Sequence, residues 1–216
     1  MTTPAFPQAC DLLIEAGWVV PVVPHGVVLV DHAVAIRGDR ILAVLPRAEA
    51  RAAFSAASLV SRPGSVLLPG LVNAHCHNPM TLMRGVADDL PLMTWLQQHI
   101  WPIEAKVIGP AFVADGIELA VAEMLRGGTT ACAENYFFPD IQAATYSRLG
   151  FRALVGLPVI DFPTAWARTQ DEYFDKGLEV HDNWRRDPLV STCFVPHAPY
   201  TVNDAAFERI RMLADQ

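Results

Sequence analysis

The chain has 216 residues, a formal net charge of −7 and 52% hydrophobic residues. This size and apolar content predict a globular protein with a substantial core. The negative charge and the lack of any clustered Lys/Arg run argue against a nucleic-acid partner or an anionic membrane surface, since both need a basic footprint. We therefore expect the partner to be a small neutral or polar molecule.

The cysteines and the N-terminal segment indicate where the protein works. Cys10, Cys76, Cys132 and Cys193 are far apart and form no CxxC pair, so neither a disulfide framework nor a thiolate zinc site is predicted. MTTPAFPQACDLL lacks a basic stretch followed by an apolar one, which argues against a signal peptide. GWVVPVVPHGVVLV is too short and too interrupted by proline to span a bilayer. These features predict a cytoplasmic protein.

Residues 1–64 are predicted to form a β-rich module. Short β-rich runs, LLIEAGWVV, GVVLV and HAVAIRGDRILAV, follow one another between residues 11 and 47, separated by turn residues. Arg37–Arg40 lies between two alternating stretches and predicts a hairpin turn, in which Gly38 tolerates a positive φ. Residues 48–60 are predicted to be helical or loop-like and to connect this module to the rest of the chain.

From residue 65 onward, strands and helices alternate. Residues 65–75 are almost continuously apolar, as expected of a strand buried on both faces. Two helices are then predicted, over 91–105 and 110–126, and Gly127-Gly128 closes the second. The remaining predicted elements are strand 129–137, helix 139–150, strand 151–160, helix 164–185, strand 190–199 and a helix from residue 202 that Asn203 or Asp204 would cap.

Repeated βα units predict a parallel sheet with right-handed crossovers. Four such units make half of a TIM (β/α)8 barrel, whose full length is roughly 250 residues. The expected fold class is therefore α/β, with residues 65–216 forming the first four units of a barrel that the chain does not close. An open doubly wound sheet is the alternative, but the first strand is not followed by a glycine-rich phosphate loop.

Two histidines close the first predicted barrel strand, in the sequence NAHCHNP. Because side chains alternate along a strand, His75 and His77 should share one face while Cys76 points to the other. Their Cα atoms would lie about 6.6–7 Å apart, so that both rings could reach one ion at about 2.0–2.1 Å. The carboxyl ends of barrel strands carry the chemistry, which places the pair well for metal binding. Two buried histidines bonded to the backbone are the alternative.

LLPGLVNAHCHNP resembles the opening motif of the metal-dependent amidohydrolase superfamily, whose members are TIM barrels flanked by a small β-sandwich. MRGVADDLPLMTWLQQHIWPIEAK and VPHAPYTV resemble its 5-methylthioadenosine/S-adenosylhomocysteine deaminase branch, which is related to chlorohydrolases. The resemblance implies that residues 1–64 are part of the sandwich. It also implies a zinc-dependent enzyme, with iron or manganese not excluded, that deaminates 5-methylthioadenosine, S-adenosylhomocysteine or adenosine to the inosine analogue and ammonia.

The same resemblance assigns roles to four residues. His75 and His77 would be metal ligands, Glu104 would hold the ribose hydroxyls and His197 would contact the purine ring. A carboxylate suits a vicinal diol because it accepts two hydrogen bonds. The alternatives remain open: Glu104 could be a solvated helix-end carboxylate paired with Lys106, and His197 could be a structural residue held by a neighbouring loop.

Other residues near these positions carry weaker expectations. Trp95, Trp101 and Met83 could wall a nucleobase pocket or belong to the core. Asp88-Asp89 is predicted to cap the helix that follows. Glu134 and Asn135 end the second barrel strand and are expected to point to the rim, with no role assigned.

No catalytic residue is expected within this portion. In the superfamily a histidine on the fifth strand, a glutamate after it, a histidine on the sixth and an aspartate on the eighth complete the site, so those residues would lie beyond Gln216. The expected partners are a nucleoside, the remainder of the same barrel and, for many soluble enzymes, further copies of the chain. A triazine chlorohydrolase, a guanine- or cytosine-type aminohydrolase and a non-catalytic barrel scaffold are the alternative functions.

Overall fold

The computed structural model describes residues 7–215, and its internal contacts divide the chain into two units between Pro69 and Gly70. Each unit is described by itself. Residues 1–6 of the segment expected to lack a signal peptide lie outside the described residues. Within residues 7–215, no helix combines the length and the apolar character that a bilayer crossing requires.

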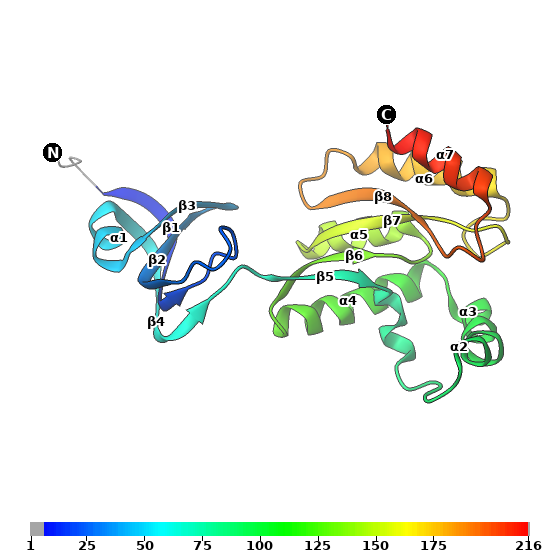
Figure 1. Ribbon diagram of the computed structural model, residues 1–216, viewed down its shortest axis with the longest axis horizontal. Helices are drawn as coiled ribbons and strands as arrows, with labels where there is room; N and C mark the ends of the chain where they lie inside the picture. Colours follow the sequence, from blue (N-terminus) through cyan, green and yellow to red (C-terminus); the bar gives the residue numbers. More distant parts are fainter. Residues whose placement is uncertain (1–6, 216) are drawn as a thin grey trace. The chain divides into compact units, whose positions relative to one another are not determined.

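The first unit is a four-stranded sheet in the order β3-β2-β1-β4 (Figure 1). Both β1–β2 and β2–β3 pair antiparallel, whereas β1–β4 pair parallel. The predicted hairpin turn joins β2 to β3, and Gly38 in it has a φ of 56°. The elements of this unit are β1 (Gln8–Val19), β2 (Leu29–Arg37), β3 (Arg40–Pro46), α1 (Arg47–Ala53) and β4 (Phe54–Leu67).

The segment expected to be a helical or loop-like connector, residues 48–60, is helical only in its first half. Its second half belongs to β4, so this part of the prediction is wrong. Phe54 begins β4 and is buried against Leu13 and Ala33, because the strand pairs with β1 along most of its length. β4 also runs through the predicted boundary between residues 64 and 65. The assignment of residues 1–64 to a sandwich stays a prediction.

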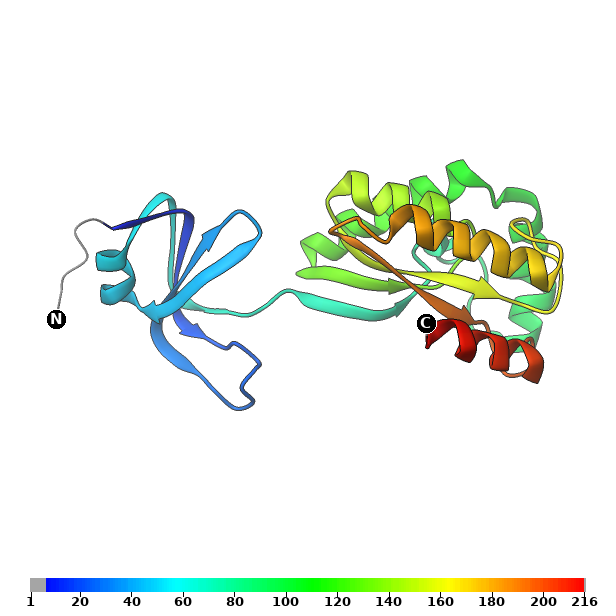
Figure 2. The same ribbon diagram turned by 90° about the horizontal axis from the view of Figure 1, so that it is seen from above.

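The second unit contains a four-stranded parallel sheet in the order β5-β6-β7-β8 (Figures 1 and 2). Helices α5 and α6 lie along one face of it and contact β7. The strands are β5 (Leu71–Cys76), β6 (Thr129–Glu134), β7 (Arg152–Val159) and β8 (Val190–Pro196). The helices are η1 (Asn78–Met83), α2 (Leu92–Trp95), η2 (Leu96–Ile100), α3 (Trp101–Val107), α4 (Pro110–Arg126), α5 (Pro139–Leu149), α6 (Gln170–Trp184) and α7 (Asp204–Ala214).

Strand β5 is shorter and less buried than the sequence predicted. It begins at Leu71 and not at residue 65, because residues 65–67 end β4, where Val66 and Leu67 pair with β1. Leu71 and Val72 keep 56% and 67% of their surface exposed, so β5 is not buried on both faces in this chain. The core of the unit lies on the helix side, where Cys76 and Cys132 pack with Val113, Ile117 and Tyr146.

The helices agree with the sequence prediction except at the N-termini of α2 and α6. Helix α4 spans the predicted 110–126, and Asn203 caps α7 by accepting a hydrogen bond from the Ala206 N–H. The cap predicted at Asp88-Asp89 is wrong, since Pro91 occupies the N-cap position of α2. The helix predicted from residue 164 begins at Gln170, because Thr169 accepts the Glu172 N–H and ends a preceding loop.

Candidate active site

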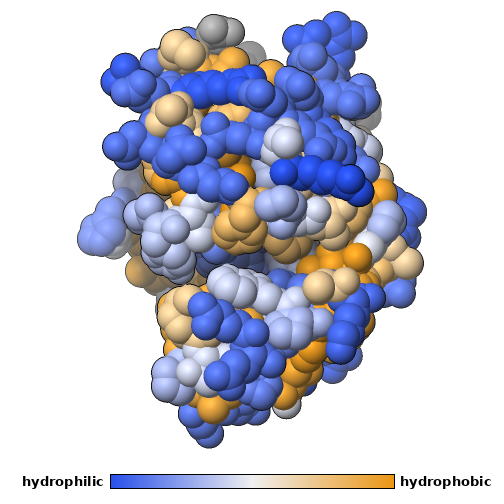
Figure 3. Space-filling model, turned by 90° about the vertical axis from the view of Figure 1, so that its right-hand side faces the viewer, coloured by the Kyte–Doolittle hydropathy of each residue, from blue (hydrophilic) through white to orange (hydrophobic). Residues whose placement is uncertain are grey.

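The carboxyl ends of the four parallel strands open onto a cavity of about 510 Å³. Figure 3 views the molecule from this side and shows a hollow bordered by both orange and pale-blue surface. Its lining is mostly aromatic and aliphatic, with few polar groups, which is the usual character of a small-molecule site. The lining residues are His77, Met80, Trp95, Leu96, Ile100, Trp101, Glu104, Ala105, Ile108, Asn135, Tyr136, Phe137, Pro158, Ile160, Phe162, Pro163, Thr164, Ala165 and His197.

The two histidines after β5 lie next to each other. Their ring centroids are 4.9 Å apart and the ring planes meet at 83°. His77 lines the cavity, whereas Cys76 between them is buried in the core on the other side of the strand. This is the arrangement that strand alternation predicts, and it leaves both imidazoles close enough to share one ion.

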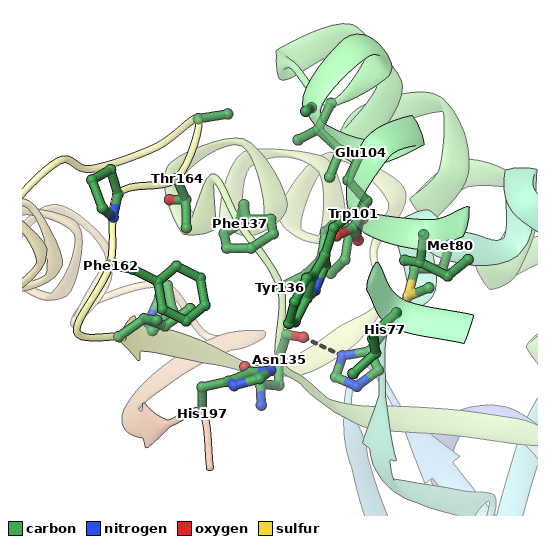
Figure 4. A pocket seen from close by; sticks show the side chains of 18 of the residues that line it. His77, Met80, Trp101, Glu104, Asn135, Tyr136, Phe137, Phe162, Thr164 and His197 are labelled. Atoms are coloured by element: carbon green, nitrogen blue, oxygen red, sulfur yellow. Dashed lines mark hydrogen bonds between the residues drawn. The ribbon is translucent and has the colours of Figure 1, made fainter. Parts of the chain in front are cut away.

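The residue that follows strand β6 holds the ring of His77 in one orientation. The His77 Nδ1 is hydrogen-bonded to the backbone carbonyl of Asn135 (Figure 4). Because a carbonyl only accepts, Nδ1 carries the proton and Nε2 keeps its lone pair. A carbonyl bonded to the far nitrogen is how proteins fix the tautomer of a metal-binding histidine. Partial desolvation by surrounding protein atoms lowers the pKa of His77, which favours the neutral, ligand-competent ring.

Glu134, at the end of β6, fixes the backbone beside His77. It is 1% exposed, and its two carboxylate oxygens accept the Asn78 N–H at 3.2 and 3.0 Å and the Asn135 N–H at 3.0 Å. Tyr146 on α5 donates its hydroxyl to the same carboxylate at 2.7 Å. Glu134 was expected to point to the rim, but it lies behind the cavity, on the helix side of the sheet. That part of the prediction is wrong for Glu134, whereas Asn135 does line the cavity.

This carboxylate has an unusual environment. Burial raises the pKa of Glu134 to about 7, although hydrogen bonds from Tyr146, Asn78 and Asn135 oppose the shift. No Lys or Arg pairs with it among the described residues. Backbone N–H groups and a phenol therefore supply most of its stabilisation. The sequence flagged Glu134 only by its place at the strand end.

The loop after His77 is held against helix α4. Residues Asn78–Met83 form the short 3-10 helix η1, in which Asn78 and Pro79 are buried. A Cβ at Gly116 of α4 would lie 2.5 Å from the Pro79 carbonyl oxygen, so glycine is needed for this close approach. The packing of η1 on α4 fixes the point at which the chain leaves the two histidines.

Glu104 reaches the cavity from α3. Its Oε1 accepts a hydrogen bond from the Tyr136 hydroxyl at 2.6 Å, and no ion pair with Lys106 is formed within the described residues. Burial raises the pKa of Glu104, and the bond from Tyr136 opposes this shift. The predicted alternative of a solvated carboxylate paired with Lys106 therefore has no support. Sequence reasoning missed Tyr136, because nothing local to YFF, which follows strand β6, indicates a partner on a helix about thirty residues earlier.

His197 follows β8 and lies on the opposite side of the cavity (Figure 4). Its Nδ1 is 2.9 Å from the Thr201 hydroxyl, an interaction within its own loop. Burial, followed by the charge of His77, lowers the pKa of His197. Both alternatives predicted for His197 therefore find a matching contact: it bonds to a residue of its own loop, and it lines the cavity.

Two of the three expected wall residues line the cavity. Trp95 and Trp101 belong to it, whereas Met83 is buried at 7% exposure outside the lining. The tryptophans are held by a helical segment that passes from α2 through the π-helix η2 into α3. A π turn is frequent at functional sites because it re-aims side chains on an otherwise regular helix. Facing them, Phe162 and Thr164 come from the loop before α6 (Figure 4).

The donors present suit a divalent transition ion but form only part of a site. Two neutral imidazoles fit zinc, iron or manganese. Within residues 7–215, no group of three or more His, Cys, Asp or Glu side chains could hold a metal. The two imidazoles thus fit a divalent metal as two of its ligands, and the described residues add no third ligand of these kinds.

Comparison with known proteins gives the family. The amidohydrolase family model matches residues 66–216. The chain belongs to the amidohydrolase family. Among curated relatives, the 5-methylthioadenosine/S-adenosylhomocysteine deaminase of Teredinibacter turnerae is 48% identical over 95% of this chain and 47% of its own length. The prediction drawn from NAHCHNP and its flanking motifs is confirmed.

Solved structures agree at the level of the fold. A crystal structure of an adenosine deaminase from Xanthomonas campestris with bound zinc is 71% identical, with a TM-score of 0.95 over 98% of this chain and 48% of that one. An atrazine chlorohydrolase from Arthrobacter aurescens TC1 is 21% identical with a TM-score of 0.82, over 94% of this chain and 51% of that one, and shows the fold alone. The chain spans about half the length of the relatives it matches.

Proposed function

We propose that the full-length protein is a zinc-dependent deaminase that hydrolyses the 6-amino group of an adenine nucleoside to give the inosine analogue and ammonia. The observation that carries the proposal is the convergence of His77, Glu104 and His197 on one mostly apolar cavity. The names of the 48% and 71% identical relatives support this substrate class, covering 5-methylthioadenosine, S-adenosylhomocysteine and adenosine. In this proposal the parallel sheet of the second unit is the first half of a (β/α)8 barrel, and the first unit is part of a β-sandwich.

In this proposal each residue of the chain has one task. His75 and His77 would hold the metal, and the Asn135 carbonyl orients the His77 ring so that its Nε2 would be the ligand. A bound divalent ion supplies the activation of water that hydrolysis at neutral pH requires. Glu104 accepts hydrogen bonds from the ribose hydroxyls, and His197 contacts the purine ring. Trp95 and Trp101 cover the nucleoside and exclude bulk water.

Ammonia release from 5-methylthioadenosine by the zinc-loaded full-length protein tests the function. We expect turnover by the parent protein and its loss in His77→Ala, with zinc content reduced in parallel. His99→Ala is the control, because His99 lies on η2 outside the cavity lining and should leave both measurements unchanged. Hydrolysis of a chlorotriazine without ammonia release from any adenine nucleoside would contradict the proposal.

The predicted cytoplasmic location and homo-oligomeric state stay predictions. Size-exclusion chromatography of the full-length protein measures the oligomeric state directly.

A further inference from the structure

A phenol and a carboxylate meet inside the cavity, and the function proposed above gives a task to the carboxylate but none to the phenol. The Tyr136 hydroxyl lies 2.6 Å from Glu104 Oε1, and both side chains line the cavity. They come from different parts of the fold, because Tyr136 follows β6 while Glu104 lies on α3. Figure 4 shows the two side chains on the same side of the cavity, next to Trp101. The hydrogen bond therefore links a side chain of helix α3 to the segment that follows strand β6.

The surroundings make this bond decisive for the position of Glu104. Among the described residues that line the cavity, Glu104 is the only carboxylate, and none is a Lys or Arg that could orient it. Tyr136 donates the one hydrogen bond that the Glu104 carboxylate receives from the described residues. A glutamate has three rotatable side-chain bonds, so without this donor its carboxylate would sample several directions. Hydrogen bonds to a charged acceptor are stronger than neutral ones, which makes the phenol an effective anchor.

The bond leaves enough acceptor capacity for a substrate. A carboxylate offers about four lone-pair positions, and Tyr136 uses one of them on Oε1. Oε2 receives no hydrogen bond from residues 7–215 and is not among the fully buried unpartnered atoms of that range, so it remains accessible. A group held in this way can accept two hydrogen bonds from neighbouring hydroxyls of one sugar.

We infer that Tyr136 is a positioning residue that holds Glu104 for a vicinal diol and thereby makes the site select nucleosides with free 2′- and 3′-hydroxyls. The inference rests on the proposed nucleoside function and deepens it by naming the residue that sets the sugar preference. Tyr136 itself need not touch the substrate. Its hydroxyl acts through the direction of the Glu104 carboxylate.

The test compares two substrates in three forms of the full-length zinc-loaded protein. The substrates are adenosine and 2′,3′-dideoxyadenosine, and the forms are the parent, Tyr136→Phe and Tyr146→Phe. Phenylalanine keeps the ring of Tyr136 and removes only the hydroxyl. We expect Tyr136→Phe to lower the preference for adenosine on the order of tenfold, mainly through KM, while kinetics with the dideoxy compound change little.

Tyr146→Phe is the matched control because Tyr146 also donates a buried phenol to a glutamate, at 2.7 Å from Glu134, but lies outside the cavity lining. It should retain the parental preference between the two substrates. A merely structural role for Tyr136 would reduce activity toward both substrates equally. An unchanged preference in Tyr136→Phe, or an equal loss with both substrates, overturns the inference.

Equilibrium binding separates this inference from the proposed function. Calorimetry with metal-stripped full-length protein measures the affinity for adenosine and for the dideoxy compound without turnover. Tighter binding of adenosine by the parent, lost in Tyr136→Phe, supports the inference. Equal binding of both compounds by the parent overturns it even if ammonia release is normal. Failure of the parent to release ammonia, with the diol preference in binding intact, contradicts deamination alone.

Discussion

Each unit of the molecule buries one glutamate completely, and the two are stabilised in opposite ways. Glu15 on β1 is 0% exposed and forms a two-point ion pair with Arg51 of α1, at 2.5 and 2.9 Å. Glu134 on β6 is 1% exposed and bonds to backbone N–H groups, a phenol and a thiol, with no cationic side chain. The hydrogen bond from Arg51 lowers the pKa of Glu15, whereas burial raises the pKa of Glu134 to about 7.

The difference in hydrogen-bond partners distinguishes a structural carboxylate, Glu15, from Glu134, which lies beside the candidate active site. Glu15 joins a helix to a sheet, and its charge is balanced within the first unit. The charge of Glu134 is not balanced, and a buried carboxylate in that state is costly. It accepts hydrogen bonds from the N–H groups of Asn78 and Asn135. Asn78 follows His77 in the sequence, and the Asn135 carbonyl orients the His77 ring. The cost is offset if a cation binds nearby, as the proposed metal would.

The largest expected effect follows from replacing Glu134. Glu134→Gln keeps the shape but replaces one carboxylate oxygen by an NH2 group, which at the Oε1 position would face the backbone N–H groups of Asn78 and Asn135. The loop that carries His77 should shift, and we expect zinc affinity to fall about tenfold or more, as for other groups that orient metal ligands. Competition with a chromophoric chelator in the full-length protein measures it.

Glu15→Gln is the matched control for that measurement. It makes the same chemical change at an equally buried glutamate whose partners all lie in the first unit. Its zinc affinity should equal that of the parent. Equal losses in the two variants would mean that the effect is general destabilisation, and no loss in Glu134→Gln would remove the link between this carboxylate and the metal.

The pH dependence of stability should have opposite signs for the two glutamates. The folded pKa of Glu15 is lowered, so its contribution is present above the unfolded pKa and is lost as pH falls through the folded value. The folded pKa of Glu134 is raised to about 7, so its contribution is present below the unfolded pKa and is lost as pH rises through about 7.

Thermal melts of metal-stripped full-length protein between about pH 4 and pH 8 test this prediction. The deficit in Tm of Glu15→Gln relative to the parent should shrink as the pH falls. Relative to the parent, Glu134→Gln should gain stability as the pH rises. Parallel curves for the two variants would show that the two carboxylates do not differ in the folded state.

Local signals were enough to predict much of this fold. The Asn203 cap depends on a side chain and a backbone N–H three residues apart, and the predicted helix 110–126 is ended by glycines next to it in sequence. The position of His77 also follows from local alternation on one strand. Such features need no knowledge of distant residues, and the structure contains each of them.

Contacts between distant segments were not predictable in the same way. Glu134 faces the helix layer because β6 pairs with β5 in a register that turns Cys132 and Glu134 toward Tyr146. The strand end ENY has few apolar residues, so its sequence does not indicate which of these side chains faces the core. The bond between Tyr136 and Glu104, and the sheet pairing of residues 54–60, depend likewise on tertiary packing.

A smaller effect is expected from removing one member of the Glu134 network. Tyr146→Phe deletes a donor to Glu134 and an acceptor for the Asn78 Nδ2, which lies 2.6 Å from the phenol. The Asn78 amide then keeps its contact with Cys132 Sγ, and leaving its other buried N–H unpaired costs about 1–2 kcal/mol. The free energy of unfolding from urea titration should fall by that amount while zinc affinity remains within about threefold of the parent, because the bonds to Asn78 and Asn135 N–H persist. A tenfold loss of zinc affinity would place Tyr146 in the same role as Glu134.

The smallest effect is expected where the ion-pair geometry of Glu15 recurs at the surface. Glu123 accepts two hydrogen bonds from Arg84, at 3.0 and 2.7 Å, and the pair lowers the pKa of Glu123 just as Arg51 does for Glu15. Its side chain is 44% exposed, however, so water and salt screen the attraction. Glu123→Gln should therefore change Tm much less than Glu15→Gln, and the change should vanish at high salt. A loss as large as that of Glu15→Gln would show that geometry, and not burial, decides what such a pair contributes.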